Sequence, residues 1–242
     1  MSTSNRVVTS ASLLLAIPLI VGGTPLIGHT ASAPKTRHVR MVSVSQFRTN
    51  FETGTFAGWT MVHSESGARA RIQKRLVRSG HWAAEFSASA IYGSYAYARR
   101  ILPQAEQNLT TSADFRIMAE GLMHSNVPLL RLFNAANQRV ISIYRQNHLR
   151  NQIWVDYHGI YRRTTGVLPL NRWGHLDVQV SMGGKSAGSV EVRLNGALIY
   201  RDMHARLTGT SLQAIQIGDE ARHQRFDVAV DNVAVSAVVV KR

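Results

Sequence analysis

The chain has 242 residues, which is enough for one β-sandwich of ordinary size after an N-terminal leader is set aside. It contains no cysteine, and this excludes a disulfide framework, a thiolate metal site and lipidation of a cysteine. Lysine and arginine number 28 against 14 aspartates and glutamates, so the net charge of +14 favours polyanions as partners. The arginines are scattered rather than gathered in runs, however, and a basic surface with no specific partner also explains this composition.

Residues 1–33 are predicted to be an export signal. Arg6 supplies a short positive start, the run 11–27 is apolar, and a small-residue A-x-A pattern ends the segment at Ala33. Prolines and glycines interrupt the apolar run, which suits a cleaved signal better than a membrane-spanning helix of about 20 residues. An uncleaved anchor is the alternative. The sequence therefore predicts a secreted, extracellular or cell-surface protein with no stable membrane span after cleavage.

Residues 34–46 are basic and predict a linker that leads to a single domain at 47–242. The segment 51–59, FETGTFAGW, predicts a turn at its TG dipeptide and an aromatic anchor at Trp59. Alternating runs separated by turn residues follow, and no segment keeps a helical period over the roughly 10 to 12 residues that a helix needs. These runs cover 70–76, 82–88, 95–102, 113–119, 129–133, 140–145 and 152–157. Their length and spacing predict an all-β fold of two packed antiparallel sheets.

The stretch 172–200, RWGHLDVQVSMGGKSAGSVEVRLNGALIY, carries the clearest strand signals. Two of its runs alternate apolar and polar residues, as half-buried antiparallel strands do, and a loop of glycine and serine separates them. The second run ends at Asn195-Gly196, a dipeptide that favours a two-residue type I′ hairpin. Pairing across that turn predicts the cross-strand pairs Leu194 with Ala197 and Val192 with Ile199.

This order of tryptophan, amphipathic strand, glycine loop, strand and LNG turn resembles the concanavalin A-like lectin/glucanase and laminin-G-like jelly rolls of secreted bacterial proteins. The segment 51–59 is similar to the opening of such domains, and FDVAVDNVAVS at 226–236 is similar to their closing strand. The resemblance implies a jelly roll in which a concave sheet is the usual sugar site. Because this fold hosts sugar-binding modules, glycosidases and lyases alike, the resemblance does not choose among these activities.

The candidate ligand-binding residues are aromatic and arginine side chains on the strands that the resemblance assigns to the concave sheet. Aromatic rings offer flat apolar faces to sugar rings, and arginine forks bind carboxylate or sulfate groups in bidentate fashion. Aromatic residues on alternating strands are more often part of a core, so packing is the alternative role for each of them. The candidates are Tyr97, Arg99, Arg131, Tyr144, Arg145, Trp154 and Tyr157.

The motifs of known enzymes on this fold are missing from the sequence. Laminarinase-type glycosidases carry an E-x-D-x-x-E triplet that places carboxylates on one face of a strand, and no such triplet exists here. Alginate-lyase relatives need R-x-E-x-R, Q-[IV]-H and Y-x-K-x-G-x-Y strands. The chain offers only QIW at 152–154 and QIG at 216–218, and both lack the histidine. No catalytic residue is therefore assigned.

Calcium is the one candidate metal. The ten histidines show no spacing typical of a zinc site. In jelly rolls of the resembled kind, oxygens of the N-terminal segment and the closing strand can hold a structural calcium ion, and the matching residues are Glu52 and Asp231. The alternative is that both are solvated acids that pair with arginines.

The preferred interpretation is a non-catalytic, lectin-like domain that binds extracellular or cell-wall polysaccharide, of anionic type, on the concave sheet. A polysaccharide lyase or glycosidase without the usual motifs is the first alternative, and a structural or adhesive protein of the cell envelope is the second. A specific nucleic-acid partner is not expected, because export separates the protein from nucleic acid and no recognised nucleic-acid-binding motif accompanies the positive charge.

Overall fold

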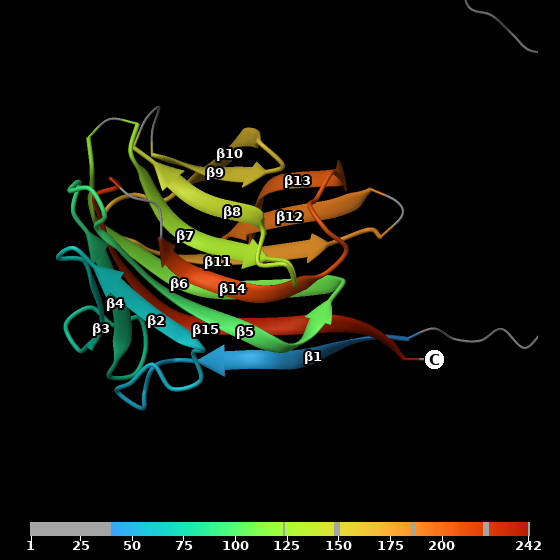
Figure 1. The fold of residues 1–242 in the computed structure, drawn as a ribbon, viewed down its shortest axis with the longest axis horizontal. Coiled ribbons are helices and arrows are strands. Elements are labelled where there is room, and N and C mark those ends of the chain that lie inside the picture. Colours follow the sequence, from blue (N-terminus) through green and yellow to red (C-terminus); the bar gives the residue numbers. More distant parts are fainter. Residues whose placement is uncertain (1–39, 123, 148–150, 185–186, 220–222, 242) are drawn as a thin grey trace, which may run out of the picture. The chain divides into compact units, whose positions relative to one another are not determined.

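A computed structural model of the protein describes residues 40–122, 124–147, 151–184, 187–219 and 223–241 (Figure 1). The predicted export signal and residues 34–39 of the predicted linker lie outside these residues and stay predictions. Residues 40–46 of that linker belong to a strand, so the folded part begins before the predicted residue 47. Every regular element of the described part is a β-strand, and none of its segments is a helix that could cross a membrane.

The strands form two antiparallel sheets that pack face to face, with sheet B in front of sheet A in Figure 1. Sheet A runs in the order β13 (Ala197–Ala205), β12 (Gly188–Leu194), β11 (Trp173–Ser181), β6 (Asn108–Glu120), β15 (Phe226–Lys241), β4 (Ala83–Ala88) and β3 (Arg69–Gln73), and β1 (Arg40–Thr49) also pairs with β15. Sheet B runs in the order β10 (Ile160–Val167), β9 (Gln152–Tyr157), β8 (Arg139–Gln146), β7 (Asn126–Phe133), β14 (Leu212–Asp219), β5 (Tyr95–Glu106) and β2 (Met61–Glu65). The predicted all-β, two-sheet sandwich is confirmed.

One apolar core lies between the sheets, and alternation along each strand decides which side chains enter it. Phe86 and Phe115 of sheet A and Ile143 and Ile217 of sheet B are all fully buried there. Successive side chains of a strand point to opposite faces, so the residues between these apolar positions form the outer faces of the two sheets. Each large apolar side chain buried in this way contributes about 1.5–3 kcal/mol to folding.

The hairpin at Asn195-Gly196 forms as the dipeptide predicts, with φ angles of 52° and 80°. Leu194 pairs with Ala197, which confirms the first predicted cross-strand pair. The second is wrong: the register shifts between Val192 and Arg193, so Val192 pairs with Tyr200 instead of Ile199. A β-bulge adds one residue to β13, and alternation alone does not reveal such an insertion.

The start of the domain also behaves as predicted. Gly54 donates its N–H to the carbonyl of Phe51 at 2.9 Å and has a φ of 70°, which makes the expected turn. Trp59 is 9% exposed and stacks on Phe51 with 6.4 Å between ring centroids and 4° between ring planes. This aromatic pair anchors the segment that leads from β1 to β2 (Figure 1).

Candidate functional site

The outer face of sheet B carries polar side chains in register. Residues paired directly across neighbouring strands share a face, so a chain of such pairs traces a line over the sheet. One line crosses all seven strands, and we call its members the polar row. The polar row is, from β2 to β10, Met61, Arg99, Gln216, Arg131, Ser142, Asp156 and Tyr161.

Arg99 is held at the β5 end of the polar row by two amide side chains. Its Nε and Nη2 donate to Oε1 of Gln216 at 2.9 and 2.6 Å, and its Nη1 donates to Oδ1 of Asn137 at 2.7 Å. The guanidinium also lies 4.0 Å from the ring centroid of Phe133. The amide nitrogen of Gln216 is buried and has no hydrogen-bond partner among the described residues. A buried donor of this kind is costly unless a bound group or water accepts from it.

Arg131 and Arg139 continue the row of guanidinium groups. Arg131 Nη1 lies 2.6 Å from Oδ1 of Asp219, and both side chains are almost fully buried. Arg139 Nη2 donates to Oδ2 of Asp156 at 2.7 Å, and the other oxygen of Asp156 is buried without a hydrogen-bond partner among the described residues. Each arginine is therefore fixed in place before a ligand arrives.

Two cavities hollow this face of the sheet. One of about 230 Å³ lies beside Arg99, with Met61 and Asn137 in its wall. The other, of about 170 Å³, lies between Arg131 and Tyr161. Both are lined mainly by residues of the polar row and their neighbours, so the row runs through the hollow part of sheet B.

Aromatic side chains flank the polar row. The rings of His63 and Tyr97 stack with their centroids 5.8 Å apart, and Tyr97 lies beside Arg99. Tyr144 pairs across the strands with Trp154. Burial raises the pKa of the Tyr144 hydroxyl well above its ordinary value, and the nearby Asp156 carboxylate raises it further. Tyr144 is therefore a protonated hydrogen-bond donor at neutral pH.

Five of the seven predicted ligand-binding residues lie together on this outer face. They are Tyr97, Arg99, Arg131, Tyr144 and Trp154.

Arg145 and Tyr157 instead point into the sandwich. Arg145 is fully buried and donates to the carbonyl of Leu168 at 2.7 Å and to the carboxylate of Glu120. The Tyr157 hydroxyl is hydrogen-bonded to the hydroxyl of Tyr200 at 2.6 Å and to the carboxylate of Asp202. Each follows directly after an outward-facing residue of its strand, so strict alternation would have excluded both from the site.

Sequence reasoning missed Gln216, Asn137, Arg139, Asp156 and His63, which contact or adjoin the predicted residues. Gln216 lies on β14, far along the chain, yet this strand runs between β5 and β7 in the sheet. A sign was available for Asp156, because it alternates in step with the predicted Trp154 on β9. Arg139 is out of step with Tyr144 on β8, and a register shift between Leu132 and Phe133 pairs it with Phe133.

The two predicted calcium ligands have other partners. Both oxygens of Glu52 accept the N–H of His81 at 3.0 Å, and Oδ2 of Asp231 accepts the N–H groups of Arg78 and Ser79 at 3.1 Å. Oxygens that face N–H donors do not fit a shared calcium site, which needs several oxygens directed at the ion. Within the described part of the chain, no group of three or more His, Cys, Asp or Glu side chains could hold a metal. The two carboxylates instead anchor the segment 78–82.

Glu52 should make the protein's stability depend on pH. The backbone N–H groups of His81 and Trp82 hold the pKa of Glu52 below its ordinary value of 4.5. A lowered carboxyl pKa adds stability above pH 4.5 that is lost as the pH falls through the folded-state pKa. Glu52→Gln should therefore lower the melting temperature at pH 7, and the difference should shrink in acid. Thermal melts across this pH range measure it.

Glu106→Gln is the control for this experiment, since no contact of the Glu106 carboxylate is among those described, and it should have little effect at any pH. Added calcium should leave the wild-type melting temperature unchanged. A calcium-dependent rise that is lost in Glu52→Gln would contradict the anchoring role and support the metal site.

No protein-family model matches this sequence, and no curated protein matches it. Solved structures do match the fold. An endo-β-1,4-glucuronan lyase from the fungus Trichoderma reesei aligns with a TM-score of 0.66 at 14% identity, over 80% of this chain and 96% of that chain. The cellulose-induced protein Cip1 aligns with a TM-score of 0.62 at 10% identity, over 78% and 96%. A carbohydrate esterase of the Shiga toxin-encoding bacteriophage phi24B aligns with a TM-score of 0.60 at 15% identity, over 81% and 99%.

At these identities the likeness is one of fold, and it is consistent with the concanavalin A-like sandwich that the sequence resembles. Polysaccharide lyases and other carbohydrate-active proteins are thus among the structural neighbours of this chain.

Proposed function

We propose that the protein binds an acidic polysaccharide along the outer face of sheet B. The observation that carries this proposal is the alignment of Arg99, Arg131 and Arg139 with the aromatic residues Tyr97 and Tyr144 on one hollowed face. Guanidinium forks recognise carboxylates, and aromatic rings pack on sugar rings. One strand separates Arg99 from Arg131, so a sugar chain lying across the strands would meet arginines about 10 Å apart.

Two further observations support an acidic ligand. The chain carries a net charge of +14, which draws polyanions towards it. The neighbours of similar fold include a glucuronan lyase and an alginate lyase, and the polymers in both names carry carboxylates. The predicted export signal would bring the protein to the compartment where such polymers occur.

Cleavage by β-elimination is the second candidate function. This reaction removes the proton next to the uronate carboxyl group, breaks the bond to the leaving sugar oxygen and returns a proton to that oxygen. It needs a group that neutralises the carboxylate, a base and an acid. Arg99 with Gln216 would supply the first, and His63 and Tyr97, stacked beside Arg99, would supply the other two.

Binding and cleavage can be tested in one experiment. The purified protein is mixed with glucuronan, alginate and a neutral glucan at low and high salt, and binding is followed by calorimetry while ultraviolet absorbance reports unsaturated uronate products. We expect binding to an acidic polymer that persists at high salt, since pairs in a hollow are screened less than exposed charges. Product absorbance would assign the lyase activity. Equal binding to every polyanion that disappears with salt would overturn the proposal.

A further inference from the structure

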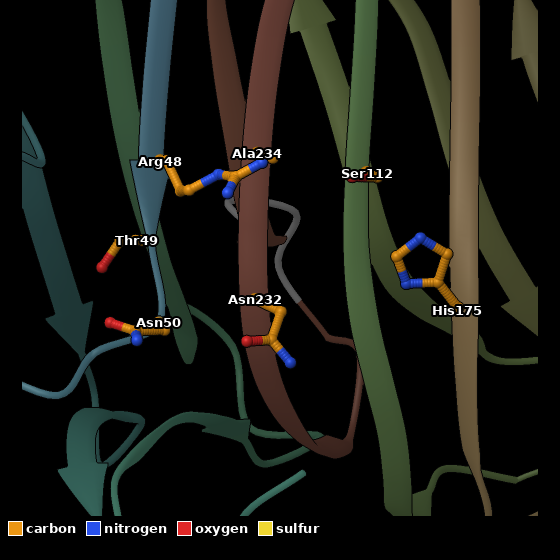
Figure 2. A pocket seen from close by; sticks show the side chains of 7 residues that line it. All are labelled: Arg48, Thr49, Asn50, Ser112, His175, Asn232 and Ala234. Carbon is orange, nitrogen blue, oxygen red and sulfur yellow. The ribbon is translucent and has the colours of Figure 1, made fainter. Parts of the chain in front are cut away.

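A further pocket lies on the opposite side of the sandwich, on the outer face of sheet A (Figure 2). Its volume is about 600 Å³, which is larger than either hollow on sheet B. Four strands and the chain that follows β1 contribute to it. The lining residues are Arg48, Thr49, Asn50, Ser112, His175, Asn232 and Ala234.

The pocket exists because small side chains occupy the middle of a cross-strand row. Arg48 pairs with Ala234, Ala234 with Ser112, and Ser112 with Asp177, so these four share one line across β1, β15, β6 and β11. The two small residues form the floor of the trough. Figure 2 shows Arg48 on one side of them and His175 on the other.

A bulge in β15 places Asn232 in the wall of this pocket. The register between β15 and β6 shifts between Asp231 and Ala234, and Asn232 adopts a left-handed φ of 51°. Its Nδ2 donates to Oδ2 of Asp114 at 2.9 Å, and its Oδ1 accepts from Oγ of Ser79 at 3.1 Å. Bulges that re-aim a side chain are common next to binding sites, and here both ends of the amide are held in place.

His175 is fixed as firmly on the opposite wall. Its Nδ1 lies 3.0 Å from Oδ1 of Asp114 and its Nε2 lies 3.3 Å from Oδ1 of Asp177. The imidazole thus lies between two carboxylates that hold it in place, and it shapes this wall of the pocket. The exposed guanidinium of Arg48 and the amide nitrogen of Asn50 have no described partner, and the hydroxyl of Ser112 lies between them and the histidine.

The pocket has no excess of positive charge. Arg48 is the one arginine or lysine that lines it, and the carboxylates of Asp114 and Asp177 lie 3.0 and 3.3 Å from the ring of His175. Hydroxyl, amide and guanidinium groups without an excess of positive charge suit a ligand that offers many neutral hydroxyls. An acidic chain would instead meet two carboxylates near one wall.

We propose that this pocket binds a neutral, hydroxyl-rich sugar unit, as a second carbohydrate site independent of the sheet B face. The two sites lie on opposite outer faces of one sandwich. The protein would therefore hold a neutral glycan on sheet A while its other face meets an acidic chain, and two weak sites on one molecule strengthen attachment to a mixed polysaccharide matrix.

The experiment uses the full chain and neutral tetrasaccharides of β-1,4-glucan, β-1,4-xylan and β-1,4-mannan, titrated by calorimetry and by NMR. Ser112→Phe fills the floor of the pocket, and Thr110→Phe makes the same change two residues away on the same face of β6, outside the lining. We expect at least one tetrasaccharide to bind and Ser112→Phe to weaken it by about tenfold or more, which corresponds to about 1.4 kcal/mol. Thr110→Phe should bind as the wild type does.

Arg48→Ala adds a second test, because it removes a wall residue that is exposed and has little influence on folding. It should weaken the same tetrasaccharide, whereas Arg99→Met on sheet B should not. Failure of all three tetrasaccharides to bind, or equal affinity in wild type, Ser112→Phe and Arg48→Ala, would overturn this site without affecting the proposal for sheet B. Loss of tetrasaccharide binding in Arg99→Met alone would show that the neutral sugar binds on sheet B. That result would also overturn the proposed site on sheet A.

Discussion

Arg99→Met is expected to lower the affinity for an acidic polysaccharide by about ten- to a hundredfold, since hydrogen bonds to charged groups contribute about 1.5–3 kcal/mol. Arg99 is 8% exposed and its guanidinium is already held by Gln216 and Asn137, so little rotamer freedom is lost when a carboxylate binds. Methionine keeps an unbranched side chain that packs on Phe133 while it removes every donor. Calorimetric titration of the wild type and the variant with glucuronan and alginate measures the loss.

A charge-matched control separates recognition from net charge. Arg69 is an exposed arginine on β3, at the edge of sheet A, and Arg69→Met removes one positive charge away from sheet B. Its affinity should stay close to that of the wild type at moderate salt. An equal loss in both variants would show that the polymer responds only to total charge, and the site on sheet B would have to be abandoned. Denaturant unfolding of Arg99→Met confirms that the compared proteins are folded.

Arg131→Met is expected to lower the free energy of unfolding by about 3–5 kcal/mol, because it removes the Arg131 cation from the side of the buried Asp219 carboxylate. The two side chains lie 2.6 Å apart and are only 9% and 3% exposed. The double variant Arg131→Met/Asp219→Asn removes both charges, so it should recover most of the lost stability. Urea unfolding followed by tryptophan fluorescence gives all three values.

An exposed ion pair of the same chemistry serves as the comparison. Arg201 Nη2 lies 2.5 Å from Oε2 of Glu191 on sheet A, and the arginine side chain is 49% exposed. Arg201→Met should cost about 1 kcal/mol or less, because solvent screens such a pair. Equal losses for Arg131→Met and Arg201→Met, or a double variant no more stable than Arg131→Met alone, would show that burial of the Arg131 charge pair has no energetic role. The double variant also provides a folded protein in which the contribution of Arg131 to polysaccharide binding can be measured.

The sandwich was predictable because its signals are local. Alternation along 172–200 and the Asn195-Gly196 turn specify strands and one hairpin through backbone geometry that involves neighbouring residues only. The same alternation also distinguishes residues of the outer face from residues of the core. It separates Tyr144 from Arg145 and Asp156 from Tyr157, and the structure places these neighbours on opposite faces of sheet B.

The partners within the site were not predictable in this way. Gln216 accepts a hydrogen bond from Arg99 although 117 residues separate them in sequence, because β14 lies between β5 and β7 in the sheet. Asp231 binds the backbone at 78–79, so a residue that fits a calcium pattern in sequence is an anchor for a loop. The pocket on sheet A likewise depends on Ala234 and Ser112, whose small size has no meaning until pairing sets them side by side.

By itself the sequence determined the fold class, the principal hairpin and most of the aromatic and arginine residues of the face on sheet B, because side-chain alternation and turn preference are properties of short segments. Only the tertiary structure decided the strand order, the bulges at β13 and β15, and which charges neutralise one another. These depend on pairing between distant strands, and an added residue at a bulge changes that pairing without changing the local pattern that precedes it.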